Sequence, residues 1–292
     1  MSATRQTRRV ALVTCTDLPG LPPDDQLVIG PLAARGVAAE PAVWDDPGVD
    51  WAAYDLVVPR STWDYPNRRT EFIAWADRVP RLANPAPVIR WNTDKRYLDA
   101  LARAGVPVVE TRWLDGPGWV LPASGEYVLK PVIGAGGVDS GRYDLSDPAH
   151  RRLAAELIGR VHAAGRAMMV QPYLPAVDTD GETALLYLGG AYSHAIRKGP
   201  LLTGPDYGVD GLYRPEDISP REATAAERAV GEAALAAVPG ADLLYARVDL
   251  IPDAAGRPLL VEFELTEPSL FLGYAPGAAD RFADAITFRV PS

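Results

Sequence analysis

Cysteine and histidine are almost absent from this chain. It has one cysteine, Cys15, in 292 residues, and a single cysteine cannot form an intramolecular disulfide. A reducing cytoplasm is therefore the expected location. The chain also has three scattered histidines, which are His150, His162 and His194. With one cysteine they give no recognisable zinc-ligand spacing, which excludes a zinc cluster as the organising element.

Long hydrophobic runs are missing as well. No apolar stretch approaches the ~20 residues that a membrane-spanning helix needs, and the first ten residues lack the apolar segment of a signal peptide. The formal net charge of −9 argues against a nucleic-acid surface. We therefore expect a small-molecule partner and neither nucleic acid nor membrane, and leave open whether the protein forms a homo-oligomer.

Lysine is the scarcest charged residue. Lysine and arginine total 29, and only three are lysine. These are Lys95, Lys130 and Lys198. A chain that uses arginine for its surface charges is expected to use lysine where a compact ammonium is needed. The alternative is that codon bias favours arginine over lysine and that the three lysines stand at these positions by chance.

The first part of the chain predicts a parallel α/β sheet. The expected elements are a strand at 9–14, a helix from 22 to 36, strands at 37–43 and 55–59, a helix ending near 79 and a proline-rich connector at 84–87. Strand–helix–strand spacing is typical of parallel sheets with right-handed crossovers. No GxGxxG follows the first strand, so a dinucleotide site is not supported.

A polar loop follows the third predicted strand, with the sequence RSTWDY over residues 60–65. Ligands of parallel sheets bind beyond the carboxyl ends of the strands. We therefore predict substrate contacts from Ser61, Thr62 and Asp64. The alternative is a packed loop whose polar groups bond one another.

Near the end of the chain, two apolar runs flank the turn-forming residues 252–257, which predicts a β-hairpin. If the six turn residues are unpaired, Asp249 lies opposite Leu260 and Arg247 opposite Glu262. Because side chains alternate along a strand, a slip of one residue would separate these groups onto two faces.

In this register Arg247, Asp249, Glu262 and Glu264 share one face of the hairpin. Three carboxylates this close repel one another unless a cation or Arg247 neutralises them. Carboxylate oxygens on a rigid sheet suit Mg²⁺, which usually takes one or two carboxylates together with substrate phosphates. A solvated acidic face is the alternative.

Two of the lysines lie in contexts that suit phosphate. A helix is expected from residue 92 or 93 to 104, with Lys95 in its first turn, where a bound anion would be favourable. Lys130 lies on a strand predicted over 126–131, which runs into the glycine-rich loop 134–137. Glycine-rich loops let backbone N–H groups approach phosphates closely.

The remaining predicted elements lie between these motifs and at the end of the chain. They are a strand at 106–109, a helix at 147–165, a strand at 168–171, a hairpin at 183–188 and 191–196 around Gly189-Gly190, a lid or substrate loop at 199–216, a capping box at 219–222 that starts a helix to 238, and a last helix near 278–288.

The order of these motifs resembles the ATP-grasp superfamily of ligases over roughly residues 92–270, and the N-terminal sheet looks like the domain that precedes it there. The resemblance implies an α/β and α+β architecture in which two α+β units sandwich ATP. The implied divisions are an N-terminal domain at 1–90, a connecting helix and strand at 91–112, a central lid subdomain at 113–172 and a C-terminal metal-binding subdomain at 173–292.

The resemblance also implies residue roles. ATP would be bound by Lys95, Lys130, Gly134, Gly136, Gly137, Gln171, Pro172, Tyr173, Leu174 and Glu182. One or two Mg²⁺ or Mn²⁺ ions would be held by Asp249, Glu262 and Glu264. The catalytic groups would be Arg247, Lys130 and Arg197. The substrate would be bound by Lys198, Thr266 and Ser269 together with Ser61, Thr62 and Asp64 of the polar loop. The chain departs from the superfamily's pattern at two positions. The superfamily often has asparagine where Glu264 stands, which affects the ligands of a second metal ion. Pro172 has no backbone N–H to donate to adenine.

The implied reaction is an ATP-dependent carboxylate–amine ligation of an amino-acid-type substrate through an acyl phosphate, giving ADP and phosphate. The loop at 60–65 is similar to that of actinobacterial amino-acid ligases, including those that cyclise O-ureido-D-serine to D-cycloserine in antibiotic biosynthesis. Intermolecular dipeptide or γ-glutamyl ligation is one alternative, and a catalytically inactive nucleotide-binding protein is another.

Overall fold

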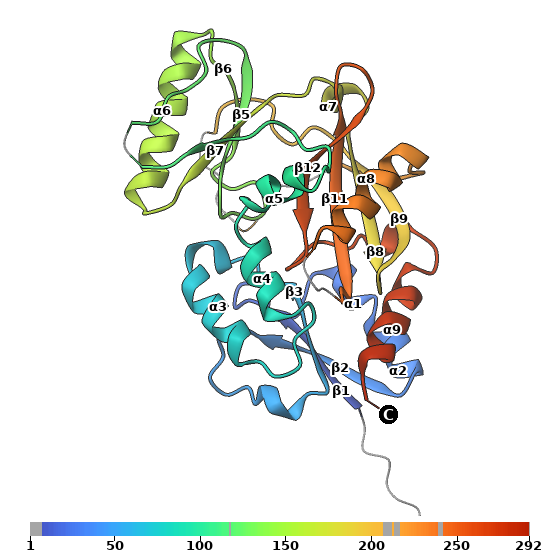
Figure 1. Ribbon diagram of the computed structural model, residues 1–292. Helices are drawn as coiled ribbons and strands as arrows, with labels where there is room; N and C mark the ends of the chain where they lie inside the picture. Colours follow the sequence, from blue (N-terminus) through green and yellow to red (C-terminus); the bar gives the residue numbers. More distant parts are fainter. Residues whose placement is uncertain (1–7, 117, 207–211, 213–216, 239–241, 292) are drawn as a thin grey trace, which may run out of the picture.

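The computed structural model describes residues 8–116, 118–206, 212, 217–238 and 242–291. Three sheets organise this part of the chain, with three, four and five strands (Figure 1). The predicted α/β and α+β fold class is confirmed. Within the same ranges, no helix is both long and apolar enough to cross a membrane.

The first sheet has the order β2-β1-β3, with all strands parallel. Its strands are β1 (Arg8–Thr14), β2 (Val37–Val43) and β3 (Leu56–Ser61), and its helices are α1 (Pro23–Gln26), α2 (Ile29–Ala34), α3 (Arg69–Arg78) and α4 (Ala86–Asn92), with the short 3-10 helices η1 (Trp51–Ala53) and η2 (Tyr65–Asn67). The single helix predicted over 22–36 is two short helices. Pro31 explains the break, because it has no N–H to bond the carbonyl of Leu27.

The second sheet is antiparallel, with the order β4-β7-β5-β6. Its strands are β4 (Arg112–Leu114), β5 (Glu126–Pro131), β6 (Gly141–Asp144) and β7 (Met168–Pro172), and it packs against helix α6 (Pro148–Ala163). Asp147 caps α6 by accepting a hydrogen bond from the backbone N of Ala149 at 2.7 Å. The predicted helix start at Asp147-Pro148 is confirmed.

The third sheet is antiparallel, with the order β10-β9-β8-β11-β12. Its strands are β8 (Glu182–Leu188), β9 (Ala191–Lys198), β10 (Ile218–Arg221), β11 (Tyr245–Pro252) and β12 (Pro258–Glu264), and the helices of this part of the chain are α7 (Ala176–Thr179), α8 (Ala225–Ala236), η3 (Leu272–Tyr274) and α9 (Ala278–Arg289). Gly189 and Gly190 join β8 to β9 with φ of 60° and 81°. The hairpin predicted there is confirmed.

The hairpin of β11 and β12 forms, but in a different register from the one predicted. Arg247 pairs with Glu264 and Asp249 with Glu262, and a bulge follows between Asp249 and Leu250. Two features each shift the pairing by one residue: Pro252 pairs with Pro258, which leaves a turn of five residues instead of six, and the bulge adds one residue on β12. A shift of two residues keeps the same side chains on the same face.

Three other local predictions were wrong. Residues 218–221 form strand β10, and the capping box lies downstream, where Thr224 and Glu227 bond each other's backbone N–H groups at the start of α8. The helix expected from residue 92 is α5 (Tyr97–Arg103), so Lys95 precedes it. Residues 106–109 make only an isolated bridge between Val108 and Leu260. The predicted loop 199–216 lies partly outside the described residues.

The last helix returns the chain to the first sheet (Figure 1). Arg35 after α2 binds Asp280 and Asp284 of α9, at 3.1 and 2.7 Å. Apolar side chains of the first sheet, the third sheet and α9 form one buried cluster. The first sheet is therefore fixed against the third, which positions its loops at the site described next.

Candidate functional site

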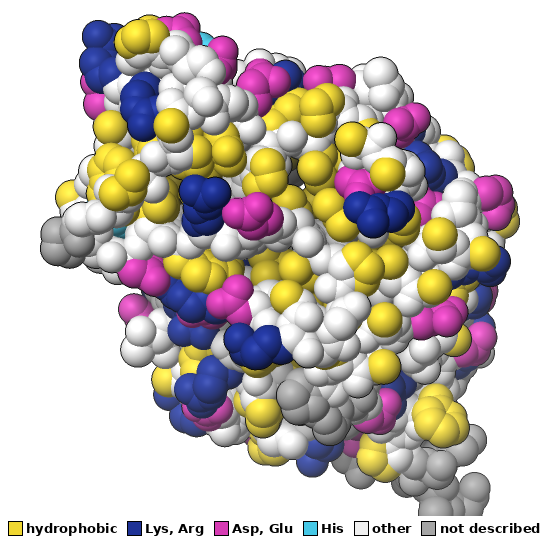
Figure 2. Space-filling view, turned by 45° about the horizontal axis from the view of Figure 1, so that its top comes forward, with side chains coloured by type: hydrophobic (Ala, Val, Ile, Leu, Met, Phe, Trp, Pro, Cys, Tyr) yellow, Lys and Arg dark blue, Asp and Glu magenta, His cyan; other side chains and the backbone are white. Residues whose placement is uncertain are grey.

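A cavity of about 550 Å³ lies between the second and third sheets and reaches the first. The segments that follow β1 and β3 of the first sheet contribute Asp24, Trp63 and Tyr65 to its wall, while the second sheet contributes Lys130 and the third Asp249. This volume lies within the range of small-molecule sites. On the face shown in Figure 2, basic and acidic side chains are interspersed, so no extended single-sign patch covers it.

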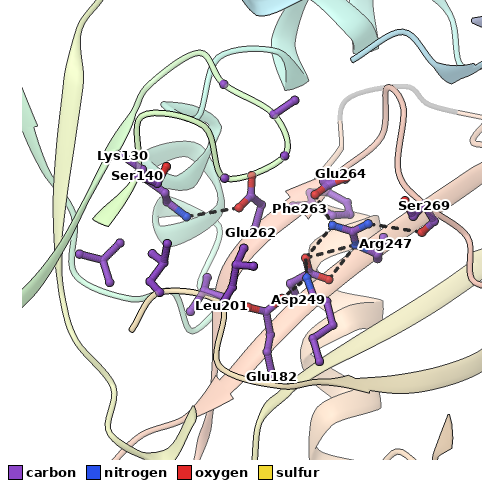
Figure 3. Close-up of a pocket in the computed structure, with 18 of the residues that line it drawn as sticks. Lys130, Ser140, Glu182, Leu201, Arg247, Asp249, Glu262, Phe263, Glu264 and Ser269 are labelled. Carbon is purple, nitrogen blue, oxygen red and sulfur yellow. Dashed lines mark hydrogen bonds and ion pairs between the residues drawn. The ribbon is translucent and has the colours of Figure 1, made fainter. Parts of the chain in front are cut away.

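Two of the lysines converge on one carboxylate at the cavity wall. Nζ of Lys95 lies 2.9 Å from Oε1 of Glu262. Nζ of Lys130 lies 3.3 Å from Oε2 of the same carboxylate (Figure 3). Lys95 also donates a hydrogen bond to the carbonyl of Gly134, at 2.8 Å. The lysine that precedes α5, the lysine of β5 and the glycine loop therefore meet at one point, which faces the acidic hairpin.

A second charge network lies beside the first. Arg247 donates to Asp249 at 3.0 Å and also contacts Glu264 (Figure 3). Nζ of Lys198 lies 2.7 Å from Asp249. Lys198 contacts Glu182 as well. All five of these side chains line the cavity. The third lysine of the chain therefore also belongs to the site.

The pKa values of the hairpin carboxylates follow from burial and these contacts. Burial alone would raise the pKa of Glu262, but Lys130 and Lys95 hold it well below the ordinary value. Burial would likewise raise the pKa of Asp249, which Arg247 and Lys198 instead lower.

Glu264 behaves in the opposite way. Burial, together with the charges of Asp249 and Glu262, raises its pKa to about 7 in spite of its contact with Arg247. The ionised form of Glu264 is therefore disfavoured where it stands, and a cation that approached this carboxylate would stabilise it.

The donor chemistry of the hairpin fits Mg²⁺, since Asp249, Glu262 and Glu264 present hard carboxylate oxygens to one cavity. In the present arrangement these groups bind lysine and arginine side chains. Across the described ranges, no group of three His, Cys, Asp or Glu side chains is close enough to hold a metal ion. Mg²⁺ needs only one or two carboxylates when phosphate oxygens complete its coordination shell. These carboxylates therefore suit Mg²⁺ that binds together with a nucleotide.

Most of the other predicted site residues also line the cavity. They are Gly134, Gly136, Gly137, Gln171, Pro172, Tyr173, Leu174 and Ser269. The loop carries positive φ at Gly136 (62°) and Gly137 (72°), which side chains with a Cβ rarely adopt. Gln171 and its successors approach the same cavity from β7 and the segment after it.

Five predicted residues are not brought to the cavity. Ser61 is fully buried and donates a hydrogen bond to Thr14, Thr62 is also fully buried, and Asp64 accepts from the indole of Trp44. Their loop follows the packed alternative, while two of its other side chains, Trp63 and Tyr65, line the cavity.

The other two are Thr266 and Arg197. The Thr266 hydroxyl is buried against Asn92. Arg197 points to the opposite face of β9 from Lys198, where it donates to the carbonyl of Asp180 at 2.9 Å. Because side chains alternate along a strand, the sequence alone could have shown that Arg197 and Lys198 point to opposite faces of β9.

Sequence reasoning missed several cavity residues. They are Asp24, Trp63, Tyr65, Asn92, Leu201, Glu267, Phe271 and Tyr274. Glu267 had a usable signal, because it continues the acidic run Glu262, Glu264 in a segment already assigned to the site. Asp24 had none, since its position depends on how the first sheet packs against the third.

Comparison with known proteins agrees with this geometry. Residues 10–84 match the family model described as D-cycloserine synthetase DcsG, N-terminal domain. Over 302 residues the chain is 39% identical to the cycloserine biosynthesis protein DcsG of Streptomyces lavendulae, covering 96% of this chain and 98% of that protein. The chain belongs to the D-cycloserine synthetase family of ATP-grasp ligases.

Solved structures extend the likeness. The crystal structure of D-cycloserine synthetase DcsG matches with a TM-score of 0.82 and 37% identity, over 97% of this chain and all of that one. D-alanine–D-alanine ligase from Bacillus anthracis matches with a TM-score of 0.63 at 15% identity, over 97% and 98% of the two chains, and shares the fold. As an ATP-grasp ligase of this family, the protein forms C–N bonds and uses ATP.

Proposed function

We propose that this ligase closes the ring of D-cycloserine from O-ureido-D-serine, with Mg²⁺ and ATP, and that it acts in antibiotic biosynthesis. Relatives that match nearly the whole chain and carry the name of this synthetase support the substrate. The observation that carries the proposal is the cavity itself. Lys95, Lys130 and Lys198, drawn from three separate segments, face the carboxylates of one hairpin there.

Lys95 and Lys130 would bind the phosphates of ATP. Both ammonium groups now contact Glu262, and both are held beside the glycine loop, whose N–H groups suit phosphate. Exchange of this carboxylate for phosphate oxygens keeps the lysines neutralised. It also releases Glu262, so nucleotide binding and metal binding would support each other.

The Glu262 carboxylate released in this way, with Asp249 and Glu264, would hold one or two Mg²⁺ ions, whose chemistry is neutralisation of phosphate charge. The substrate carboxylate would attack the γ-phosphate, giving an acyl phosphate and ADP. Phosphoryl transfer of this kind needs positioning and charge neutralisation rather than a protein nucleophile.

The second step is ring closure, in which the oxygen-bound nitrogen of the ureido group displaces phosphate from the activated carbonyl carbon. The carbamoyl group on this nitrogen is removed by hydrolysis, in which water converts it to carbon dioxide and ammonia, and D-cycloserine remains. Arg247 would stabilise the charge on the tetrahedral intermediate or on the departing phosphate. Its guanidinium is buried and fixed by Asp249, by Glu264 and by the carbonyl of Ser269 at 3.3 Å. A preorganised donor of this kind costs no rearrangement during the reaction.

The remaining assignments are also proposals. Gln171, Pro172, Tyr173 and Leu174 would hold adenine, and Glu182 the ribose or phosphates. The chain would divide near residues 90, 112 and 172, and the enzyme would work in the cytoplasm.

The test is a product assay. We expect the protein to form ADP from ATP and Mg²⁺ when O-ureido-D-serine is the sole added substrate, and to yield D-cycloserine, identified by mass. ADP formation that requires a second amino acid would instead indicate intermolecular ligation. If neither O-ureido-D-serine nor any amino acid pair elicits ADP, the ligase proposal is wrong for this chain.

A further inference from the structure

One buried carboxylate of the cavity has no role in the scheme above. Glu267 lies three residues after the last hairpin carboxylate, lines the cavity and is 7% exposed. Its backbone carbonyl accepts a hydrogen bond from the indole of Trp63 at 3.1 Å. The hydroxyl of Tyr65, which is 4% exposed, lies near enough to this carboxylate to lower its pKa. The two rings of the first-sheet loop thus hold this residue in place.

The Glu267 carboxylate differs from the other acids of the cavity because no cationic side chain of the described ranges forms an ion pair with it. Lys95 is near enough to affect its pKa but contacts Glu262. A carboxylate buried without a cation is unfavourable, and an amide or an apolar side chain would fill the same space without that cost. An acid kept here is explained by a cation that arrives with the ligand.

Asp24, another acid that reaches this wall, is less suited to that role. Its two carboxylate oxygens accept hydrogen bonds from the backbone N–H groups of Leu272 and Gly273, both at 2.9 Å. Asp24 therefore fixes the segment after Glu267. That segment places Phe271 and Tyr274 at the cavity, and aromatic faces also attract cations.

We propose that Glu267, oriented by Tyr65 and Trp63, binds the α-ammonium group of an amino-acid substrate. This inference rests on the proposed function, because it supplies the recognition that the reaction itself does not require. Glu264 and Arg247 lie close enough to Glu267 to shift its pKa. An ammonium bound at Glu267 would therefore direct the adjacent α-carboxylate toward the hairpin, where the phosphate is transferred. Tyr65 and Trp63 are positioning residues in this arrangement.

The test is a cycle of two enzymes and two substrates. The substrates are O-ureido-D-serine and its deamino analogue, in which hydrogen replaces the α-ammonium. The enzymes are the wild type and Glu267→Gln, which keeps the shape and removes the charge. We expect the wild type to have a higher kcat/KM for the amino substrate than for the deamino analogue. In the variant this ratio of kcat/KM values should be about 10- to 100-fold smaller, which is the range for a charge-assisted hydrogen bond.

Rates with the deamino analogue and the KM for ATP should stay unchanged in Glu267→Gln, because neither depends on the ammonium contact. A purely structural role would instead reduce both substrates equally. Tyr65→Phe should shift the preference in the same direction by a smaller factor, and Glu222→Gln, an exposed acid, should not shift it. Equal loss for both substrates, or an unchanged preference in Glu267→Gln, would overturn the inference.

Failure of the proposed function can be distinguished from failure of this inference. If the wild type forms no ADP with O-ureido-D-serine, the ring-closure proposal fails. The same cycle is then run with the amino acid that does support ADP formation and with its deamino analogue. Should no amino acid support ADP formation, both proposals are wrong.

Discussion

Nζ of Lys130 lies 3.3 Å from Oε2 of Glu262, although 132 positions of sequence separate the two residues. The lysine comes from the second sheet and the glutamate from the third, so the contact joins the two walls of the cavity. Lys95 reaches the other oxygen of the same carboxylate. Removal of one lysine thus leaves Glu262 paired, which makes Lys130 a clean target for testing nucleotide binding.

Lys130→Ala is expected to lower ATP-dependent turnover by at least about 100-fold, since a positioned charge opposite the transferred phosphoryl group is lost. ADP release measures the effect, and the thermal unfolding midpoint should stay near that of the wild type. Arg152→Ala, which removes an exposed cation from α6 beside the same sheet, is the control and should leave turnover unchanged. Equal effects of the two substitutions would argue against a phosphate-binding role for Lys130.

Glu267 should make the stability of the nucleotide-free protein depend on pH. Burial and the charge of Glu264 raise its pKa from 4.5 to about 8 on folding. The folded state therefore binds this proton more tightly than the unfolded state, and the stabilisation is complete below pH 4.5 and is lost as the pH rises toward 8. Glu267→Gln should be more stable than the wild type at pH 8 by a few kcal/mol, and should lose that advantage by pH 5.

Denaturant unfolding of both proteins at several pH values measures this difference. Glu264 also titrates in this range and its charge acts on Glu267, so the difference between the two proteins measures the protonation of Glu267 together with its repulsion by Glu264. A constant difference between pH 5 and pH 8 would contradict the expectation.

Asn84 should contribute strongly to stability. Its side chain is fully buried, donates to the carbonyls of Tyr245 and Leu265 at 2.9 and 2.7 Å, and accepts from the N–H of Leu244 at 2.7 Å. Asn84→Ala would leave three buried backbone groups without their partner. We expect a loss of about 3 kcal/mol in the free energy of unfolding. The exposed Asn67, changed to Ala, serves as the control and should cost far less.

The sequence predicted those parts of the fold whose signals are local. The strand of Lys130, the Gly189-Gly190 turn and the cap at Asp147 each depend on a few neighbouring residues, and each was found where expected. The face shared by Asp249 and Glu262 was also predicted correctly. Their register was not, because the two-residue shift comes from the pairing of Pro252 with Pro258 and from the bulge after Asp249, and the alternation of side chains reveals neither.

Predictions that needed contacts between sheets were less successful. Polarity pointed to Ser61, Thr62 and Asp64 as substrate contacts, but the packing of the first sheet turns these groups inward. Trp63 and Tyr65 face the cavity in their place. No local pattern distinguishes the two outcomes, because the contacts that orient this loop come from distant residues: Ser61 bonds Thr14, Asp64 bonds Trp44, and Trp63 bonds the carbonyl of Glu267, 204 positions away. The same holds for Asp24, which bonds the segment after Glu267.

The most direct test of the account is Asp249→Asn, assayed for ADP formation with ATP, Mg²⁺ and O-ureido-D-serine. Asp249 is 1% exposed and faces Arg247 and Lys198 on the cavity wall. Asp253→Asn, in the turn of the same hairpin, removes a carboxylate outside the cavity and is the matched control. The account predicts a loss of at least about 100-fold in Asp249→Asn with unfolding behaviour retained, and activity close to wild type in the control. Wild-type rates in Asp249→Asn would contradict it.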